Sequence, residues 1–133
     1  MDKPKLRVLV IEDEESIRRF MQRVLEPSYE FHEAPDGTEG IKQARSVKPQ
    51  VILLDLRLPD MDGLSVLAKL KTNPDTLAIP IVIVSARGET GVVVEGQQSG
   101  AADYLIKPFT IEQLREVVQR NIILEDPLHT SRQ

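Results

Sequence analysis

The chain has 133 residues, of which 41% are hydrophobic and 29% charged, with a formal net charge of −4 and no cysteine. This length and composition predict one globular domain with an aliphatic core and exclude a disordered or fibrous chain. The lack of cysteine excludes disulfides and thiolate metal sites, and the net negative charge argues against nucleic-acid binding by this domain. No apolar run has the length of a membrane span and no secretory signal is expected, so we expect a cytoplasmic location without membrane contact.

Short apolar segments alternate along the chain with segments of helical periodicity. The expected strands are Leu6 to Ile11, Tyr29 to Ala34, Val51 to Leu54, Ile81 to Val84 and Tyr104 to Ile106. Three of these segments are almost continuously apolar, as expected for strands that are covered on both faces. The alternation predicts an α/β fold built around a parallel sheet.

The helices are indicated by apolar residues at helical spacing. The first helix covers Ile17 to Leu25, and a shorter second helix is marked by Ile41 and Ala44. A third helix covers Leu64 to Leu70 and is expected to end near Asn73-Pro74, because proline stops helical continuation.

The C-terminal third has a weaker helical pattern. The crossover from Gly88 to Gly100 contains glycines and three successive valines, which have poor helix propensity, so we expect a labile fourth helix there. Apolar residues from Leu114 to Val118 mark the last helix, and periodicity is lost after it. We therefore expect a domain over 1–123 and a C-terminal tail or linker stub over 124–133.

Candidate site residues follow the carboxyl ends of four expected strands. Glu12 and Asp13 follow the first strand, Asp55 the third, Ser85 the fourth and Lys107 the fifth. Ligands of an open parallel sheet bind beyond these ends, where the strand order reverses. With the order 2-1-3-4-5, Glu12, Asp13 and Asp55 should converge into one pocket. Such adjacent carboxylates raise a pKa or bind a hard cation, and Mg²⁺ prefers oxygen ligands.

The same residues have the chemistry needed for phosphoryl transfer. An ammonium, a hydroxyl and a divalent ion around a carboxylate can neutralise the oxygens of a transferring phosphoryl group. Asp55 would be the nucleophile, with Lys107 and Ser85 beside it. The pattern therefore predicts an aspartyl phosphate at Asp55.

Four motifs carry a resemblance to a known family. They are Val-Leu-Val-Ile-Glu-Asp-Glu, Leu-Leu-Asp-Leu-Arg-Leu-Pro-Asp-Met-Asp-Gly, Ser85-Ala86 and Gly-Ala-Ala-Asp-Tyr-Leu-Ile-Lys-Pro-Phe. In this order they resemble the receiver domains of two-component response regulators, the family of the single-domain chemotaxis receivers. The resemblance covers Leu6 to Gln119 and implies a flavodoxin-like, doubly wound, five-stranded parallel sheet of order 2-1-3-4-5 with helices on both faces.

The resemblance also implies a magnesium site and a phosphoacceptor. Asp13, Asp55 and the backbone carbonyl of Arg57 would ligate Mg²⁺, and Glu12 would hold a metal-bound water. Asp55 would accept the phosphoryl group from a sensor histidine kinase or a histidine phosphotransfer protein. The domain would thus be a signalling domain that catalyses only its own phosphorylation and dephosphorylation.

The resemblance implies that Ser85 would hydrogen-bond the phosphoryl oxygen and that Lys107 would pair with it. It also implies a cis Lys107-Pro108 peptide. Ser85 and Tyr104 would be the switch residues, with Tyr104 at the family's aromatic switch position. The surface around the fourth helix and fifth strand would then change. That surface would contact an output domain or a partner protein, or form a phosphorylation-dependent homodimer.

Other interpretations were weighed against this one. A phosphatase with an aspartyl nucleophile would place a second acid two residues after the nucleophile, where this chain has Arg57. A pseudo-receiver, an interaction module that is not phosphorylated, stays open, although the intact site residues argue against it. Asp62-Gly63 is interpreted as the turn and N-cap that open the third helix rather than as part of the site.

Overall fold

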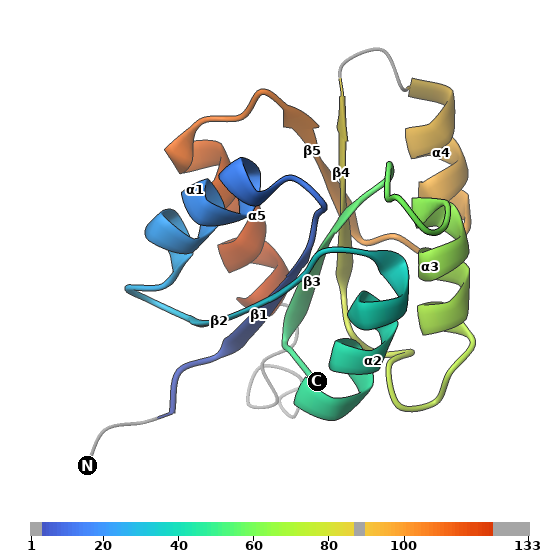
Figure 1. Ribbon diagram of the computed structural model, residues 1–133, viewed down its shortest axis with the longest axis horizontal. Coiled ribbons are helices and arrows are strands. Elements are labelled where there is room, and N and C mark those ends of the chain that lie inside the picture. Colours follow the sequence, from blue (N-terminus) through green and yellow to red (C-terminus); the bar gives the residue numbers. More distant parts are fainter. Residues whose placement is uncertain (1–3, 87–89, 124–133) are drawn as a thin grey trace.

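Parallel pairing of five strands forms the sheet at the centre of the molecule (Figure 1). The computed structural model describes residues 4–86 and 90–123. Its strands are β1 (Arg7–Ile11), β2 (Glu30–Ala34), β3 (Val51–Asp55), β4 (Ile81–Ala86) and β5 (Asp103–Lys107). They pair in the order β2-β1-β3-β4-β5, and every neighbouring pair is parallel. The predicted strand order is confirmed, so the first and third strands lie side by side.

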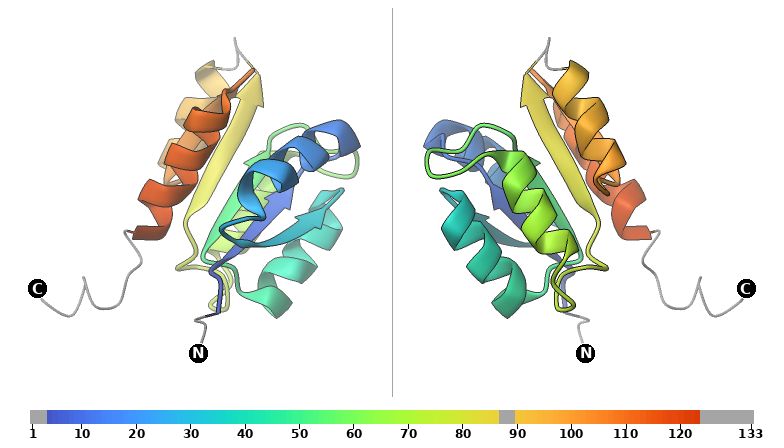
Figure 2. Two further views of the ribbon diagram at one scale, coloured as in Figure 1. Left: turned by 90° about the vertical axis from the view of Figure 1, so that its left-hand side faces the viewer. Right: turned by 90° about the vertical axis from the view of Figure 1, so that its right-hand side faces the viewer.

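Helices connect the strands and cover both faces of the sheet. They are α1 (Glu15–Leu25), α2 (Gly37–Val47), α3 (Gly63–Lys71), α4 (Thr90–Gln98) and α5 (Ile111–Ile123). α1 and α5 lie on one face, and α2, α3 and α4 lie on the other (Figures 1 and 2). This is the doubly wound, flavodoxin-like arrangement that the sequence predicts.

Alternate strand residues feed two separate apolar clusters. In β1, Val8 and Val10 pack with α1 and α5, whereas Leu9 and Ile11 pack with α2 and α3. Every residue of β3 is buried. Since a strand in the middle of a covered sheet meets apolar side chains on both faces, this explains the continuous apolar run of 51–54.

Local hydrogen bonds fix where several helices begin. The Asp36 side chain accepts a hydrogen bond from the Glu39 amide at 2.8 Å, and the Asp62 side chain accepts one from the Leu64 amide at 3.0 Å. The interpretation of Asp62 as an N-cap is confirmed. The prediction of a shorter second helix is wrong, because α2, capped by Asp36, has 11 residues, as α1 has.

Some predicted element bounds differ from the observed ones. β4 continues two residues past Val84, because Ser85 and Ala86 pair with the end of β5. The fourth helix is present as α4, while residues 87–89 of that crossover and the expected tail over 124–133 lie outside the described residues. In the described part of the chain, no helix has the length and apolar character that a membrane span requires.

Candidate functional site: an acidic pocket at the carboxyl edge of the sheet

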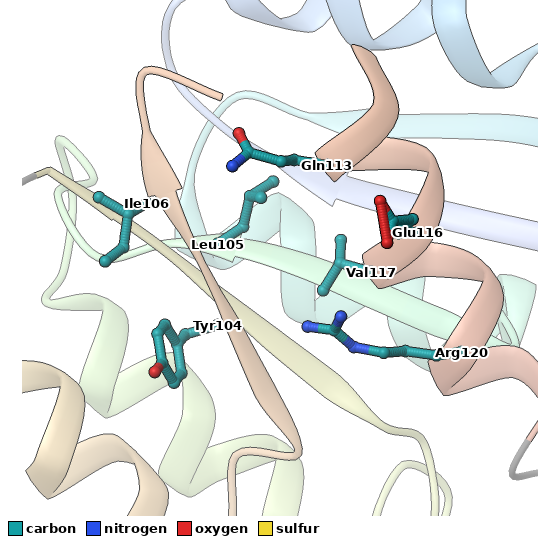
Figure 3. Close-up of a pocket in the computed structure, with 7 residues that line it drawn as sticks. All are labelled: Tyr104, Leu105, Ile106, Gln113, Glu116, Val117 and Arg120. Atoms are coloured by element: carbon teal, nitrogen blue, oxygen red, sulfur yellow. The ribbon is translucent and has the colours of Figure 1, made fainter. Parts of the chain in front are cut away.

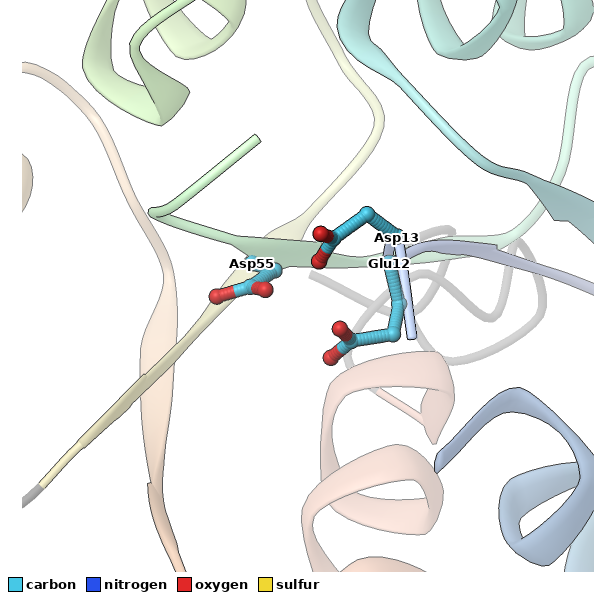
Figure 4. A group of neighbouring side chains, drawn as sticks. All are labelled: Glu12, Asp13 and Asp55. Atoms are coloured by element: carbon cyan, nitrogen blue, oxygen red, sulfur yellow. The ribbon is translucent and has the colours of Figure 1, made fainter. Parts of the chain in front are cut away.

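Three carboxylates meet where β1 and β3 end (Figure 4). One oxygen from each of Glu12, Asp13 and Asp55 lies within 4.8 Å of the others. The pairing of Ile11 with Leu54 sets this geometry, because it ends the two strands at the same level. Glu12 and Asp55 are buried and Asp13 is exposed, so the group opens to solvent on the Asp13 side.

Lys107 provides a positive charge within this acidic group. Its Nζ lies 3.0 Å from Glu12 Oε1 and 3.5 Å from Asp55 Oδ2. Burial lowers the pKa of Lys107, but its hydrogen bonds and attraction to Glu12 and Asp55 outweigh burial and raise the pKa above its usual value. Lys107 is therefore a fixed cation at neutral pH, and the Lys107-Pro108 peptide that follows it is cis, as predicted.

The electrostatic balance of the pocket is shown by Glu12. Burial raises the pKa of Glu12 to about 7, and the charge of Asp55 adds to this effect, while the Glu14 amide and Lys107 oppose it. One lysine thus does not fully compensate the carboxylates. A hard divalent cation would favour the ionised form of Glu12, and the three carboxylate groups are the oxygen donors that Mg²⁺ prefers. The side chains present therefore fit a magnesium ion.

The two oxygens of Asp55 have different surroundings. The backbone amide of Arg57 donates a hydrogen bond to Asp55 Oδ1 at 3.2 Å, while Oδ2 faces Lys107. Arg57 is exposed, and it forms an isolated antiparallel bridge with Asp62. The Asp55 carboxylate is thus held in one orientation by the loop that follows β3. The role of the Arg57 carbonyl as a metal ligand stays a prediction.

Ser85 lies at the same edge of the sheet, at the end of β4. Its side chain is buried, and its Oγ has no hydrogen-bond partner among the described residues. In the β4–β5 ladder Ser85 pairs with Ile106, directly before Lys107. A buried hydroxyl without a partner is costly, so it is a signal for a ligand that the pocket accepts.

Tyr104 is on β5 but is not part of this pocket. It is 41% exposed and lines a separate hollow between β5 and α5. Of the predicted site residues, the structure therefore brings Glu12, Asp13, Asp55 and Lys107 into direct proximity and places Ser85 at the same edge.

Two residues that the sequence interpretation did not assign to the site lie close to it. Arg18 of α1 hydrogen-bonds the backbone carbonyls of Glu12 and Asp13. Gly63 starts α3, and a Cβ there would lie 2.5 Å from Leu56 Cα and 2.7 Å from the Asp55 carbonyl oxygen. The Asp-Gly pair was a usable signal for this close approach, whereas nothing in the sequence distinguishes Arg18 from its neighbour Arg19.

Comparisons with known proteins agree with this fold. The model of the response regulator receiver domain family matches residues 8–119. The transcriptional regulatory protein SrrA of Staphylococcus aureus (strain NCTC 8325 / PS 47) is 45% identical over 114 residues, which are 85% of this chain and 45% of that protein. This chain thus spans less than half of that relative.

Solved structures are similar over nearly the whole chain. The receiver domain of the Francisella response regulator 1452 matches with a TM-score of 0.83 and 31% identity, covering 92% of this chain and 100% of that one. The chemotaxis response regulator CheY4 of Vibrio cholerae matches with a TM-score of 0.82 and 29% identity, covering 88% and 98%. Because the family model matches residues 8–119, which are most of this chain, the chain belongs to the response regulator receiver domain family.

Proposed function

We propose that this domain is a phosphorylation switch in which Asp55 accepts a phosphoryl group from a phosphohistidine of a sensor histidine kinase or a histidine phosphotransfer protein. The observation that carries the proposal is the convergence of Glu12, Asp13 and Asp55, with Lys107 in contact with Glu12 and Asp55. The lysine supplies positive charge for the anionic group that is transferred, and the carboxylates supply the nucleophile and the oxygen ligands of a divalent cation.

Phosphorylation of Asp55 and its reversal take place in two steps. An oxygen of the Asp55 carboxylate attacks phosphorus, a P–O bond forms, and the P–N bond to the donor imidazole breaks with its electron pair going to nitrogen. A water molecule later attacks the same phosphorus, breaks the P–O bond, restores the Asp55 carboxylate and releases inorganic phosphate. The domain acts on its own side chain in both steps, which makes it a signalling domain rather than an enzyme for a separate substrate.

Three groups around Asp55 contribute to these steps in different ways. The Arg57 amide keeps one Asp55 oxygen hydrogen-bonded, which orients the carboxylate for attack. Lys107, already 3.5 Å from the other oxygen, neutralises the charge that arrives with the phosphoryl group. Ser85 supplies a buried hydroxyl that has no hydrogen-bond partner among residues 4–86 and 90–123.

We assign the cation role to Mg²⁺. Asp13, Asp55 and the Arg57 carbonyl would hold the ion, with Glu12 acting through a bound water. The ion supplies positive charge to the phosphoryl oxygens when it is bound. Asp13, the exposed member of the group, is the one that an incoming ion reaches from solvent.

An apolar hollow beside the pocket suits the donor protein. A hollow of about 510 Å³ is lined by Ser16, Ile17, Phe20, Lys107, Pro108 and Phe109. The rings of Phe20 and Phe109 lie 6.0 Å apart, and Phe20 is 37% exposed. Because Lys107 belongs both to this hollow and to the acidic pocket, a helix seated here would bring its phosphohistidine next to Asp55.

The output surface is assigned to β5 and its neighbours. Tyr104 and Ile106 are both 41% exposed, and a hollow of about 280 Å³ lies between β5 and α5 (Figure 3). Ser85 moving toward a phosphoryl group would open space for Tyr104 to turn inward and so change this surface. An output domain, a partner protein or a second phosphorylated copy would recognise the change. The relative SrrA is named as a transcriptional regulatory protein, which is consistent with an output domain in that protein.

The test uses beryllofluoride as a phosphoryl analogue and acetyl phosphate as a donor. Wild-type protein should gain the mass of one phosphoryl group and bind beryllofluoride only with Mg²⁺, and Asp55→Asn should do neither. A folded wild-type protein that does neither would instead support the pseudo-receiver, an interaction module that keeps the fold without the chemistry.

A further inference from the structure

The guanidinium of Arg18 holds the loop that carries two of the three acidic residues. Its Nη1 donates hydrogen bonds to the backbone carbonyl oxygens of Glu12 at 2.8 Å and Asp13 at 3.0 Å. One nitrogen thus joins the two consecutive residues that follow β1. The Arg18 side chain is only 14% exposed; its bond to the Glu12 carbonyl is partly buried, and its bond to the Asp13 carbonyl lies at the surface.

Arg18 is itself held in place from β2. Its Nε donates to Glu33 Oε1 at 2.7 Å, and its backbone amide donates to the Glu14 carbonyl at 3.1 Å. The side chain therefore connects the first turn of α1, the second strand and the loop between β1 and α1. With Nε and Nη1 both engaged, the guanidinium has little freedom to move away from the loop.

Asp13 depends on this arrangement more than Glu12 does. Glu12 has further anchors, because its amide donates to the Ala34 carbonyl at 3.0 Å and its carboxylate accepts from the Glu14 amide at 3.1 Å. Asp13 is exposed, so the backbone of the loop sets the direction in which its carboxylate points. Arg18 acts directly on that backbone at the Asp13 carbonyl.

We propose that Arg18 is a positioning residue that sets the Asp13 carboxylate for cation binding, an inference that rests on the function proposed above. Groups that orient metal ligands change metal affinity by roughly 10- to 100-fold when they are removed. In the described structure, the Arg18 side chain contacts the backbone carbonyls of Glu12 and Asp13 and not the carboxylates of the acidic pocket. It acts through the loop backbone, and its orientation comes from Glu33.

The direction of the change in Mg²⁺ affinity distinguishes a positioning role of Arg18 from a purely electrostatic one. Removing a positive charge near an acidic site should tighten the binding of a cation, since repulsion is lost. Removing a residue that positions a ligand should weaken binding instead. Replacement of Arg18 by a neutral residue therefore gives opposite results for the two explanations.

Arg19 provides a matched control on the same helix. It also forms an ion pair with Glu33, and its Nη1 donates to Gln22 at 2.7 Å. The partners of Arg19 in the described structure are thus on α1 and β2, not on the loop carbonyls. Arg19→Gln removes the same charge and the same type of ion pair, but leaves the Arg18 bonds to the loop.

The experiment is a calorimetric titration of the full chain with Mg²⁺ alone, alongside thermal unfolding without metal. We expect Arg18→Gln to raise the Kd for Mg²⁺ about tenfold, Arg18→Lys about threefold and Arg19→Gln less than twofold. At saturating Mg²⁺, phosphorylation of Arg18→Gln by acetyl phosphate should return to within about threefold of wild type, because the reacting groups are intact. This small donor needs no docking surface, so loss of partner contacts cannot mimic the result.

Each outcome decides one proposal. If wild type binds Mg²⁺ and Arg18→Gln binds it equally or more tightly, Arg18 has no positioning role and the phosphoacceptor function stands. If Arg18→Gln does not fold, the charge-preserving Arg18→Lys decides, and an unchanged affinity in that variant overturns the inference. If wild type neither binds Mg²⁺ nor becomes phosphorylated, it is the proposed function that fails.

Discussion

Lys107 Nζ lies 3.5 Å from Asp55 Oδ2, although β4 separates the strands on which the two residues lie. The contact is made above the end of β4, and Lys107 also reaches Glu12 of β1 at 3.0 Å. One side chain thus links the ends of three strands. This position makes Lys107 both a partner of the nucleophile and a competitor of any bound cation.

Neutralising Lys107 should separate cation binding from chemistry. In Lys107→Gln, Mg²⁺ affinity should rise roughly threefold to tenfold, because a like charge near the site is removed. Phosphorylation by acetyl phosphate at saturating Mg²⁺ should fall about 100-fold, because the charge that stabilises the transferring group is lost. Calorimetry and mass spectrometry measure the two effects, with Lys107→Arg as the charge-preserving control. A parallel fall in both quantities would contradict the assignment.

The raised pKa of Glu12 predicts how the stability of the metal-free protein depends on pH. Burial raises this pKa from 4.5 to about 7 in the folded state, so the folded protein binds an additional proton between these values. The resulting stability is complete below about pH 4.5 and is lost as pH rises through about 7. Its size is about 1–3 kcal/mol.

Urea unfolding in the presence of a chelator measures this dependence. Between pH 5 and pH 8, the unfolding free energy of wild type should decline relative to that of Glu12→Gln, which has no proton to lose at this site. Added Mg²⁺ should stabilise wild type more strongly at pH 8 than at pH 5, because a cation competes with the proton. Parallel pH profiles for the two proteins would show that Glu12 titrates normally.

Substitution of Ser85 should affect the resting and the loaded states differently. Its Oγ is buried without a partner in the described structure, so Ser85→Ala should leave the unfolding free energy of the metal-free protein unchanged or raise it by up to about 1 kcal/mol. In the presence of Mg²⁺, the same variant should bind beryllofluoride at least tenfold more weakly, because the bound group then lacks the donor that the Ser85 hydroxyl provides. Equal beryllofluoride affinity would make Ser85 a packing residue.

Gly63 and Gly91 should respond in opposite directions to the same change. A Cβ at Gly63 would lie 2.5 Å from Leu56 Cα, and backbone atoms move only at high cost, so Gly63→Ala should destabilise the protein by about 2–4 kcal/mol. Gly91 lies within α4 with nothing inside 4 Å of its Cβ position, so Gly91→Ala should stabilise by about 0.5–1 kcal/mol. Thermal or urea unfolding of the two variants gives the comparison.

The sheet and its acidic edge could be predicted because short, local sequence patterns indicate both of them. Continuous apolar runs mark the buried strands, and the residues after them share one edge by the geometry of parallel sheets. Asp55 and Lys107 could therefore be placed together without knowledge of a distance.

Long-range hydrogen bonds could not be predicted in this way. Arg18 and Arg19 look equivalent on the polar side of α1, and only the position of Glu33 on β2 and the path of the β1–α1 loop determine which one reaches the Asp13 carbonyl. The length of α2 does not follow from its apolar residues, because only Ile41 and Ala44 mark the helix and its start depends on the Asp36 cap.

The complete burial of β3 has a further consequence. Amide protons of a fully covered central strand are expected to exchange slowly with solvent, because core strands open at free energies that approach that of global unfolding. Asp55 therefore lies on a strand that is expected to open rarely. Side chains that would meet a donor protein, such as Phe20, lie on the outside of α1. Substitutions on that outer surface can change which donor is recognised without shifting the Asp55 backbone, so partner choice and phosphoryl chemistry are able to diverge separately.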